Sequence, residues 1–297
     1  MNTGPLRGKG MRLVAFLCWV FALGQPALAA SPALEPLERQ LGWLAAAQTS
    51  DVGIAALDLK SGELISLRGD EPFPMASTVK IAVAANYLAQ VEYGRRSLDD
   101  TISGRSARSL LEAMIIRSDN HATDVLIRDL GGASTLQSWL DQHQLKGLRI
   151  DRNIAQLLSA KRDLKDVRDS STPRAMVDLL ARIDSGKLLK PEGRSYLLTL
   201  MARCKTGKNR IRGMLPFGTH VENKTGTLNG LTTDVGFITL PDGRRIAVAF
   251  FARYGSDRPR TIAQAARTIY DGFAHWVARP FTTTLTPSLT PAPVGGR

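Results

Sequence analysis

The stretch from Ser77 to Val91 reads STVKIAVAANYLAQV and is apolar on nearly every side. Such a pattern is typical of a helix buried at the centre of a protein. Lys80 is unfavourable there, because burial without a partner depresses the pKa of an ammonium group or carries a free-energy penalty. Ser77 lies three residues earlier, on the same face of the expected first turn. A desolvated lysine beside it can accept or relay the serine proton, which predicts a serine nucleophile.

Two further motifs fit this chemistry. Ser118-Asp119-Asn120 follows an apolar-periodic helix, so a hydroxyl and an amide can project into a cleft from a helix end. Taken alone, the motif is better explained as the cap of a helix that begins near Ala122. Lys224-Thr225-Gly226 is expected in a strand, and taken alone it could be a solvated surface strand. A glycine inside a strand often marks close approach by a ligand or another backbone, and lysine and threonine can bind a substrate carboxylate.

The ordered set of Ser-x-x-Lys at 77–80, Ser-Asp-Asn at 118–120 and Lys-Thr-Gly at 224–226 resembles the class A β-lactamases and penicillin-binding proteins, the active-site serine penicillin-recognising family. The likeness spans about residues 35–279. A second Lys-Thr-Gly at 205–207 follows a helix and is interpreted as a chance match.

The resemblance implies a role for each matching residue. The catalytic residues are Ser77, Lys80 and Ser118, with Ser118 passing the proton to the leaving nitrogen. The N–H groups of Ser77 and Thr227 would form the oxyanion hole. The substrate-binding residues would be Asn120, Lys224, Thr225, Gly226, Thr227 and Arg210. Structural roles fall to Asp119, Arg152 and Asp169, the last two as an ion pair that closes a loop. Arg210 fits a solvated arginine in a basic run equally well.

The loop between Arg152 and Asp169 departs from the class A pattern, in which a glutamate activates the deacylating water. Counting forward from Arg152 puts Ile154 at that position, and counting back from Asp169 puts Gln156 there. Neither residue is a carboxylate. A positioned general base is worth roughly 10²- to 10⁴-fold in rate. The resemblance without this glutamate therefore predicts acylation at Ser77 followed by slow or atypical deacylation.

Three functions remain open. The leading hypothesis is an exported serine hydrolase that opens the amide of a small-molecule β-lactam. The second is a D-alanyl-D-alanine-type peptidase, esterase or amidase acting on a peptide-like substrate, and it is favoured by the missing glutamate and by a stretch, 98–111, without aromatic residues. The third is a non-enzymatic protein that binds β-lactams or cell-wall fragments. The intact serine and lysine positions argue against it, because such sites cost stability to keep.

The beginning of the chain predicts export. Basic residues at 7, 9 and 12 precede an apolar run from Leu13 to Leu23, and Ala27-Leu28-Ala29 resembles a cleavage site, so residues 1–29 are expected to be a signal peptide. This indicates a periplasmic or secreted protein. After cleavage Cys204 is the one cysteine left, which excludes an internal disulfide.

Charge and composition limit the range of binding partners that we expect. The 297 residues carry a formal net charge of +12, or +9 without the signal peptide. Arginine and lysine are spread along the chain instead of interleaved with aromatics, so an anionic cell-envelope polymer is favoured over nucleic acid. The four histidines show no ligand spacing, and no phosphate-binding loop is present, so we expect no metal and no cofactor. A chain of this size can bury its own core, so a monomer is expected.

The distribution of strands and helices predicts an α+β fold. Strands at both ends with helices between them indicate one antiparallel sheet built from the N- and C-terminal segments with flanking helices, plus an inserted all-helical lobe. We expect a serine hydrolase domain at 30–279, with a sheet lobe at 30–70 and 205–279 and a helical lobe at 71–204. The active site would lie at their seam. The Thr/Pro-rich tail at 280–297 is expected to be disordered.

Overall fold

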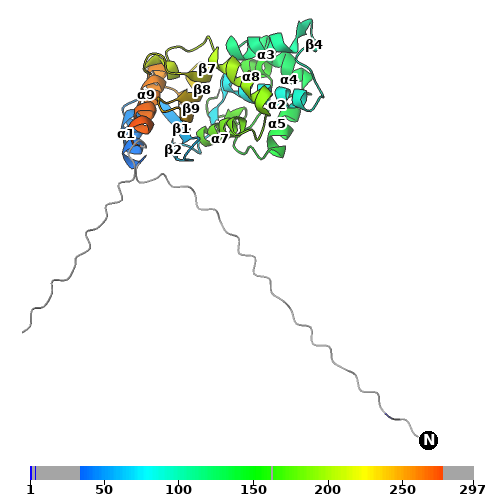
Figure 1. The fold of residues 1–297 in the computed structure, drawn as a ribbon, viewed down its shortest axis with the longest axis horizontal. Helices are drawn as coiled ribbons and strands as arrows, with labels where there is room; N and C mark the ends of the chain where they lie inside the picture. Colours follow the sequence, from blue (N-terminus) through cyan, green and yellow to red (C-terminus); the bar gives the residue numbers. More distant parts are fainter. Residues whose placement is uncertain (2–3, 5–33, 162, 277–297) are drawn as a thin grey trace, which may run out of the picture.

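The computed structural model describes residues 34–161 and 163–276, together with Met1 and Gly4 (Figure 1). Apart from these two positions, the predicted signal peptide lies outside the described residues, as does the predicted tail. In the part of the chain that is described, no helix is both long enough and apolar enough to cross a membrane.

A five-stranded antiparallel sheet forms one half of the molecule, in the strand order β2-β1-β9-β8-β7. Its strands are β1 (Asp51–Asp58), β2 (Leu64–Leu67), β7 (Val221–Leu228), β8 (Leu231–Thr239) and β9 (Arg245–Arg253). The N-terminal helix α1 (Glu35–Ala46) and the C-terminal helix α9 (Arg258–Trp276) lie side by side against it (Figure 1). Segments from the two ends of the chain therefore meet in one sheet.

The central strands are buried on both faces because helices cover both. Along β9, alternate residues enter different cores, as the pleat of a strand requires. Ile246, Val248 and Phe250 pack with residues of α1 and α9. Ala247 and Phe251 face the opposite side and pack with the helical part of the chain. The near-continuous apolar sequence of β9 is therefore explained by its position between two layers of helices.

The helical half surrounds α2, which is buried along most of its length and packs against α3, α4, α5 and α8. Its helices are α2 (Lys80–Glu92), α3 (Ala107–Ile116), α4 (Asn120–Asp129), α5 (Ala133–Gln142), α6 (Ile154–Ser159), α7 (Pro173–Asp184) and α8 (Pro191–Ala202). Short 3₁₀ segments are η2 (Ala76–Val79) and η3 (Ile211–Gly213), and two-residue strands are β3 (Phe73–Pro74), β4 (Thr101–Ile102), β5 (Arg105–Ser106) and β6 (Ser170–Ser171). The predicted α+β fold class is confirmed.

A buried ion pair joins three parts of the sheet half. Asp58, at the end of β1, is fully buried and accepts a hydrogen bond of 2.6 Å from the Arg244 guanidinium. Its other oxygen accepts from the backbone N–H of Lys60 at 2.8 Å, and Arg244 also donates to the Phe273 carbonyl of α9 at 2.9 Å. One carboxylate therefore fixes the β1–β2 turn, the start of β9 and α9 relative to one another.

Replacing Asp58→Asn should cost about 3 kcal/mol of unfolding free energy, because removing one partner leaves a buried charge uncompensated. The matched control is Asp271→Asn, whose i,i+4 pair with Arg267 is half exposed and should be worth less than about 0.5 kcal/mol. Urea unfolding measures both. If both variants lost the same small amount of unfolding free energy, the buried pair would not contribute the stability expected of it.

Candidate active site

Ser77 lies in a tight 3₁₀ turn, and the prediction of a place in the first turn of the α-helix is wrong in this detail. The helix α2 begins at Lys80, whose N–H donates to the Ser77 carbonyl. Ala76 has a φ of 49°, the left-handed region that costs an alanine roughly 1–2 kcal/mol. Thr78 fixes the turn because its N–H and its hydroxyl both donate to the Met75 carbonyl, at 3.1 and 2.7 Å.

Gly226 allows this turn to approach strand β7. A Cβ atom at Gly226 would lie 2.8 Å from the Met75 carbonyl oxygen and 3.0 Å from Ala76 Cβ. Any side chain would therefore push the turn that carries Ser77 away from the sheet. Of the two explanations left open by the sequence, ligand or backbone, the structure shows the close approach of a backbone.

Two lysines converge on the hydroxyl of Ser118. Lys80 Nζ lies 3.2 Å from Ser118 Oγ and donates at 2.7 Å to both the Ser118 carbonyl and Asn120 Oδ1. Lys224 Nζ donates at 2.8 Å to Ser118 Oγ and to the Thr225 carbonyl. A hydroxyl that accepts from two lysines keeps its own hydrogen free to donate to a third group. The Ser118 hydroxyl is therefore held between α2 and β7, with its own hydrogen available to a further acceptor.

Burial determines the charge of the two lysines, since both are fully buried. The pKa of Lys80 is lowered to about 7, mainly by burial and also by the charge of Lys224, against the raising effect of Asp119 and Asp124. Burial also lowers the pKa of Lys224 to about 8. Near neutral pH a large share of Lys80 is therefore a free amine, the form in which a lysine can accept a proton.

The Ser-Asp-Asn motif both caps a helix and faces the site. Asp119 is the N-cap of α4, and its Oδ1 accepts from the Ala122 N–H at 2.7 Å. Ser118 adopts a left-handed φ of 61°, which turns its hydroxyl toward the two lysines. Asn120, the first residue of α4, faces Lys80. The capping interpretation thus applies to Asp119 alone.

Arg210 lies against strand β7, so the alternative of a freely solvated arginine is wrong. Its guanidinium donates at 2.9 Å to the carbonyls of Gly226 and Thr233, and at 2.7 Å to Thr227 Oγ1. Thr227 itself is exposed at the end of β7. The cationic guanidinium therefore borders the strand segment that is predicted to bind substrate.

Sequence reasoning missed two neighbours of this strand. Thr206, in the Lys-Thr-Gly taken as a chance match, has its hydroxyl 2.5 Å from Thr225 Oγ1. Asp234, on β8, is fully buried, and burial raises its pKa to about 6. It accepts from Asn223 Nδ2 at 2.8 Å and from the Ile211 N–H at 3.2 Å. The sequence did carry a signal for Asp234, which is a lone aspartate inside an apolar strand. A buried carboxylate needs hydrogen-bond partners, so other polar groups had to lie beside it.

The loop from Asp151 to Asp169 is closed by side chains. Asp169 Oδ1 accepts from the N–H groups of Asp151 and Arg152 at 2.8 and 2.9 Å, and Oδ2 accepts from Arg152 Nε at 2.5 Å. Ile154, the first residue of α6, is buried in the helical core. Gln156 is exposed, and its Oε1 accepts from the Asn153 N–H at 3.0 Å.

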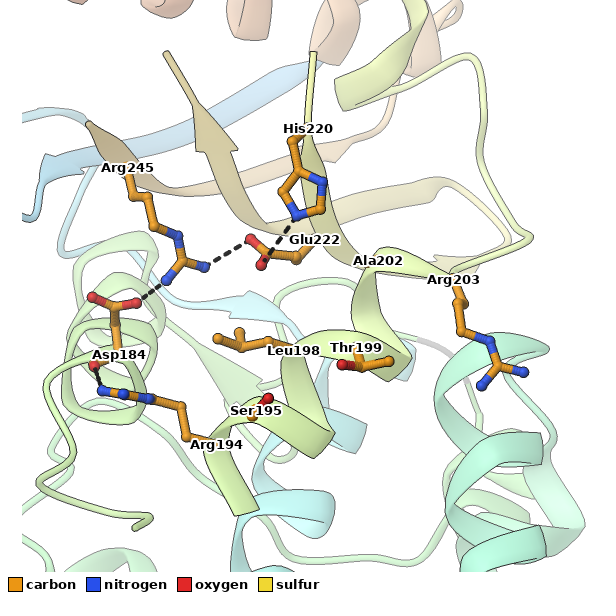
Figure 2. A pocket seen from close by; sticks show the side chains of 10 residues that line it. All are labelled: Asp184, Arg194, Ser195, Leu198, Thr199, Ala202, Arg203, His220, Glu222 and Arg245. Carbon is orange, nitrogen blue, oxygen red and sulfur yellow. Dashed lines mark hydrogen bonds and ion pairs between the residues drawn. The ribbon is translucent and has the colours of Figure 1, made fainter. Parts of the chain in front are cut away.

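A separate hollow of about 630 Å³ lies away from these residues (Figure 2). It is lined by Asp184, Arg194, Ser195, Leu198, Thr199, Ala202, Arg203, His220, Glu222 and Arg245. Its charges largely neutralise one another, because Arg245 bridges Asp184 and Glu222, and His220 Nε2 lies 3.3 Å from Glu222 (Figure 2). None of the predicted catalytic residues lines it. Within the described ranges 34–161 and 163–276, no cluster of His, Cys, Asp and Glu could hold a metal ion.

Comparison with known proteins agrees with this geometry. The sequence profile of the β-lactamase enzyme family matches residues 36–273. The extended-spectrum β-lactamase PER-1 of Pseudomonas aeruginosa is 27% identical over 267 residues, which cover 79% of this chain and 86% of that protein. The carbapenem-hydrolyzing β-lactamase KPC of Klebsiella oxytoca is 30% identical over 247 residues, which cover 74% of this chain and 83% of that protein.

A solved structure of an ancestral class A β-lactamase superposes with a TM-score of 0.75 at 32% identity, covering 80% of this chain and 100% of that one. A β-lactamase from Chitinophaga pinensis gives a TM-score of 0.75 at 28% identity, with 80% and 99% covered. Fold and site together define an active-site serine hydrolase. The chain belongs to the β-lactamase enzyme family and is a β-lactamase-like enzyme, which confirms the family that its motifs resemble.

Lys80 and Lys224 should lose their protons near pH 7 and pH 8, because burial penalises the ammonium form. The Cε resonances of ¹³C-labelled lysine, followed by NMR from pH 5 to 11, measure this directly. Lys80→Arg and Lys224→Arg assign the two signals, and exposed lysines, which titrate near about 10.4, are the internal control. If every lysine signal titrated near that value, the proposed base would be absent.

Proposed function

We propose that this protein is an exported β-lactamase-type serine hydrolase that is acylated at Ser77 by β-lactams and releases the acyl group by a slow or atypical route. The observation that carries the proposal is the Ser118 hydroxyl held between Lys80 and Lys224, with Lys80 three residues after Ser77 in the chain. The relatives named above as β-lactamases support this substrate class. The basic and apolar residues that begin the chain support export to the periplasm or the medium.

Acylation follows from these contacts. Neutral Lys80 takes the proton of Ser77, and the serine oxygen bonds to the carbonyl carbon of the β-lactam. The carbonyl oxygen becomes an oxyanion, which the N–H groups of Ser77 and Thr227 would stabilise. As the C–N bond breaks, Ser118 gives its hydrogen to the leaving nitrogen and recovers one from Lys80. The products are an ester on Ser77 and an opened ring with an N–H.

Binding of the substrate carboxylate is assigned to the end of β7. Lys224 supplies a buried positive charge there, and the hydroxyls of Thr225 and Thr227 supply hydrogen bonds. Arg210 is close enough to donate to Thr227 Oγ1, at 2.7 Å, so its charge supports the same subsite. Asn120, held by Lys80, would bind the acylamide side chain of the substrate.

Deacylation lacks a positioned carboxylate in this proposal. Ile154 is apolar and buried, and Gln156 turns away to cap Asn153, so neither would activate a water. Because such a base is worth roughly 10²- to 10⁴-fold, the ester on Ser77 should persist. The same feature suits a peptidase or esterase that uses a different acceptor, and this is the second candidate function.

The first test is the intact mass of the chain from Ala30 onward during incubation with a penicillin and a cephalosporin. We expect an adduct that forms quickly and decays slowly, because Lys80 drives acylation but no carboxylate drives release. Ser77→Ala is the control and should remain unmodified.

Other outcomes of the mass measurement are informative. Drug consumption without an adduct would mean fast deacylation through a base not identified above, and would contradict the slow step. No reaction in the parent chain would overturn β-lactam acylation and favour the peptidase or esterase function.

Adding a carboxylate should accelerate release of the acyl group. Ile154→Glu places it at the start of α6, beside α4 and the side of the site that carries Asn120, so the adduct should decay at least about tenfold faster. Gln156→Glu adds the same charge at an exposed position two residues on and tests the other candidate for the missing glutamate. Adduct decay is read from the mass spectra after removal of free drug, with thermal unfolding as the check on folding. Unchanged decay in both variants would refute the assignment of the missing base.

A further inference from the structure

A second hollow, of about 300 Å³, lies in the helical half where α2 packs against α5. From α2 it is lined by Asn86 and Gln90, which are four residues apart and therefore share one face of that helix. Trp139 lines it from α5, and the loop after α2 adds Arg95 and Arg96. None of the residues assigned to the active site lines this hollow.

The charge of the hollow is positive. Two guanidinium groups line it, and no carboxylate does so among the described residues. Arg96 is compensated by Asp129, whose Oδ2 accepts from Arg96 Nε at 2.9 Å. Arg95 is exposed and forms no ion pair within the part of the chain that is described, and its guanidinium donates at 3.5 Å to the neutral Gln90 Oε1. One positive charge is therefore available at the hollow without a counter-ion.

Two buried donors of the hollow have no hydrogen-bond partner. Asn86 is 2% exposed and Trp139 is 6% exposed. Within residues 34–161 and 163–276, neither Asn86 Nδ2 nor Trp139 Nε1 donates to any group, although buried polar groups are almost always paired. Neither atom is sealed inside the protein. Since both side chains line the hollow, a group bound there can accept from them.

A short chain of hydrogen bonds determines which end of the Asn86 amide is free. A guanidinium has only donors, so Gln90 turns its Oε1 toward Arg95 and its Nε2 toward Asn86 Oδ1. The Asn86 oxygen is thereby used, and the free atom is the donor Nδ2. Both bonds are long, at 3.5 and 3.4 Å, and an N–H···O bond is usually about 2.7–3.2 Å. They hold these groups weakly and leave them available to a better acceptor.

We propose that the hollow between α2 and α5 is a binding site for a small organic anion, which it holds by a carboxylate or phosphate group. Arg95 supplies the charge, and Asn86 Nδ2 and Trp139 Nε1 supply hydrogen bonds, which are stronger when the acceptor is ionised.

The size and the apolar part of the hollow fit such a ligand. Leu130 and the Trp139 ring, each 6% exposed, offer apolar contact to the body of the ligand. The volume of about 300 Å³ is at the lower end of the roughly 300–1,000 Å³ of small-molecule sites, which suits a ligand with one ring. Binding here needs no reaction at Ser77, so the inference does not depend on the proposed function.

The indole N–H signal of Trp139 in ¹⁵N NMR spectra of the chain from Ala30 onward reports on binding. Phenyl phosphate and benzoate are the probes, and benzyl alcohol, which has the same ring without a charge, is the control. We expect the Trp139 signal to shift and saturate with at least one anion, and the signal of Trp43, which is exposed on α1, to stay in place. Trp139→Phe assigns the signal, and the tighter anion identifies the preferred acidic group.

Arg95→Gln tests the charge. It removes an exposed guanidinium, so it should leave the fold intact and weaken anion binding at least about tenfold. The matched control is Arg260→Gln, which removes an exposed positive charge from α9 in the other half of the molecule and should leave the affinity unchanged.

Asn86→Leu tests the buried donor. It should also weaken binding at least about tenfold, whereas the Tm should stay the same or rise, because an apolar side chain replaces a buried amide with one long hydrogen bond. A lower Tm with unchanged affinity would make Asn86 a structural residue and overturn its role in the site. If this variant does not fold, Arg95→Gln decides the proposal alone.

Three results would overturn the anion site. An unmoved Trp139 signal with both anions would mean that water satisfies the free donors. Equal shifts with benzyl alcohol would mean that binding does not require an acidic group. Equal weakening by Arg95→Gln and Arg260→Gln would mean that only the net charge of the protein matters. No β-lactam takes part in these measurements, so their outcome is separate from that of the proposed function.

Discussion

The meeting of two buried ammonium groups on one hydroxyl oxygen is the interaction on which the rest of this structure depends. Lys80 comes from the central helix, Lys224 from an outer strand of the sheet, and Ser118 from the connection between α3 and α4. Removing two like charges from water is unfavourable, so carbonyl oxygens, Asn120 and nearby carboxylates must surround them. Burial nevertheless lowers the pKa of both lysines, so that Lys80 is partly a free amine near neutral pH.

The backbone around the site is arranged to bring these groups together. Ala76 and Ser118 both adopt left-handed conformations, which glycine could adopt at lower energy. Such strain persists only where the surrounding contacts hold it. Gly226 has no side chain because the turn before Ser77 occupies that space. The sheet and the helices therefore approach one another closely through their backbones at this boundary. The strain there lowers stability but positions the turn that carries Ser77.

The 151–169 loop is organised by different means. Carboxylates on both sides accept hydrogen bonds from its backbone N–H groups. Asp169 closes the loop on itself, whereas Asp124 ties it to the helix that carries Asn120. Membership of the β-lactamase family agrees with the convergence of Lys80, Lys224 and Ser118.

The sequence by itself predicted the fold class, because apolar periodicity and turn residues are properties of neighbouring residues. It also singled out Ser77, Lys80, Ser118 and Lys224 as candidates, through the resemblance of their motifs to a known family. It also indicated the cap formed by Asp119. Only the tertiary structure showed the contact between Thr206 and Thr225, the burial of Asp234 and the hydrogen bond from the Ile154 N–H to Asp124. Those features depend on which charges and backbones meet between segments that are distant in the chain, such as Asp124 and Ile154, which are 30 positions apart. Local spacing carries no information about such encounters.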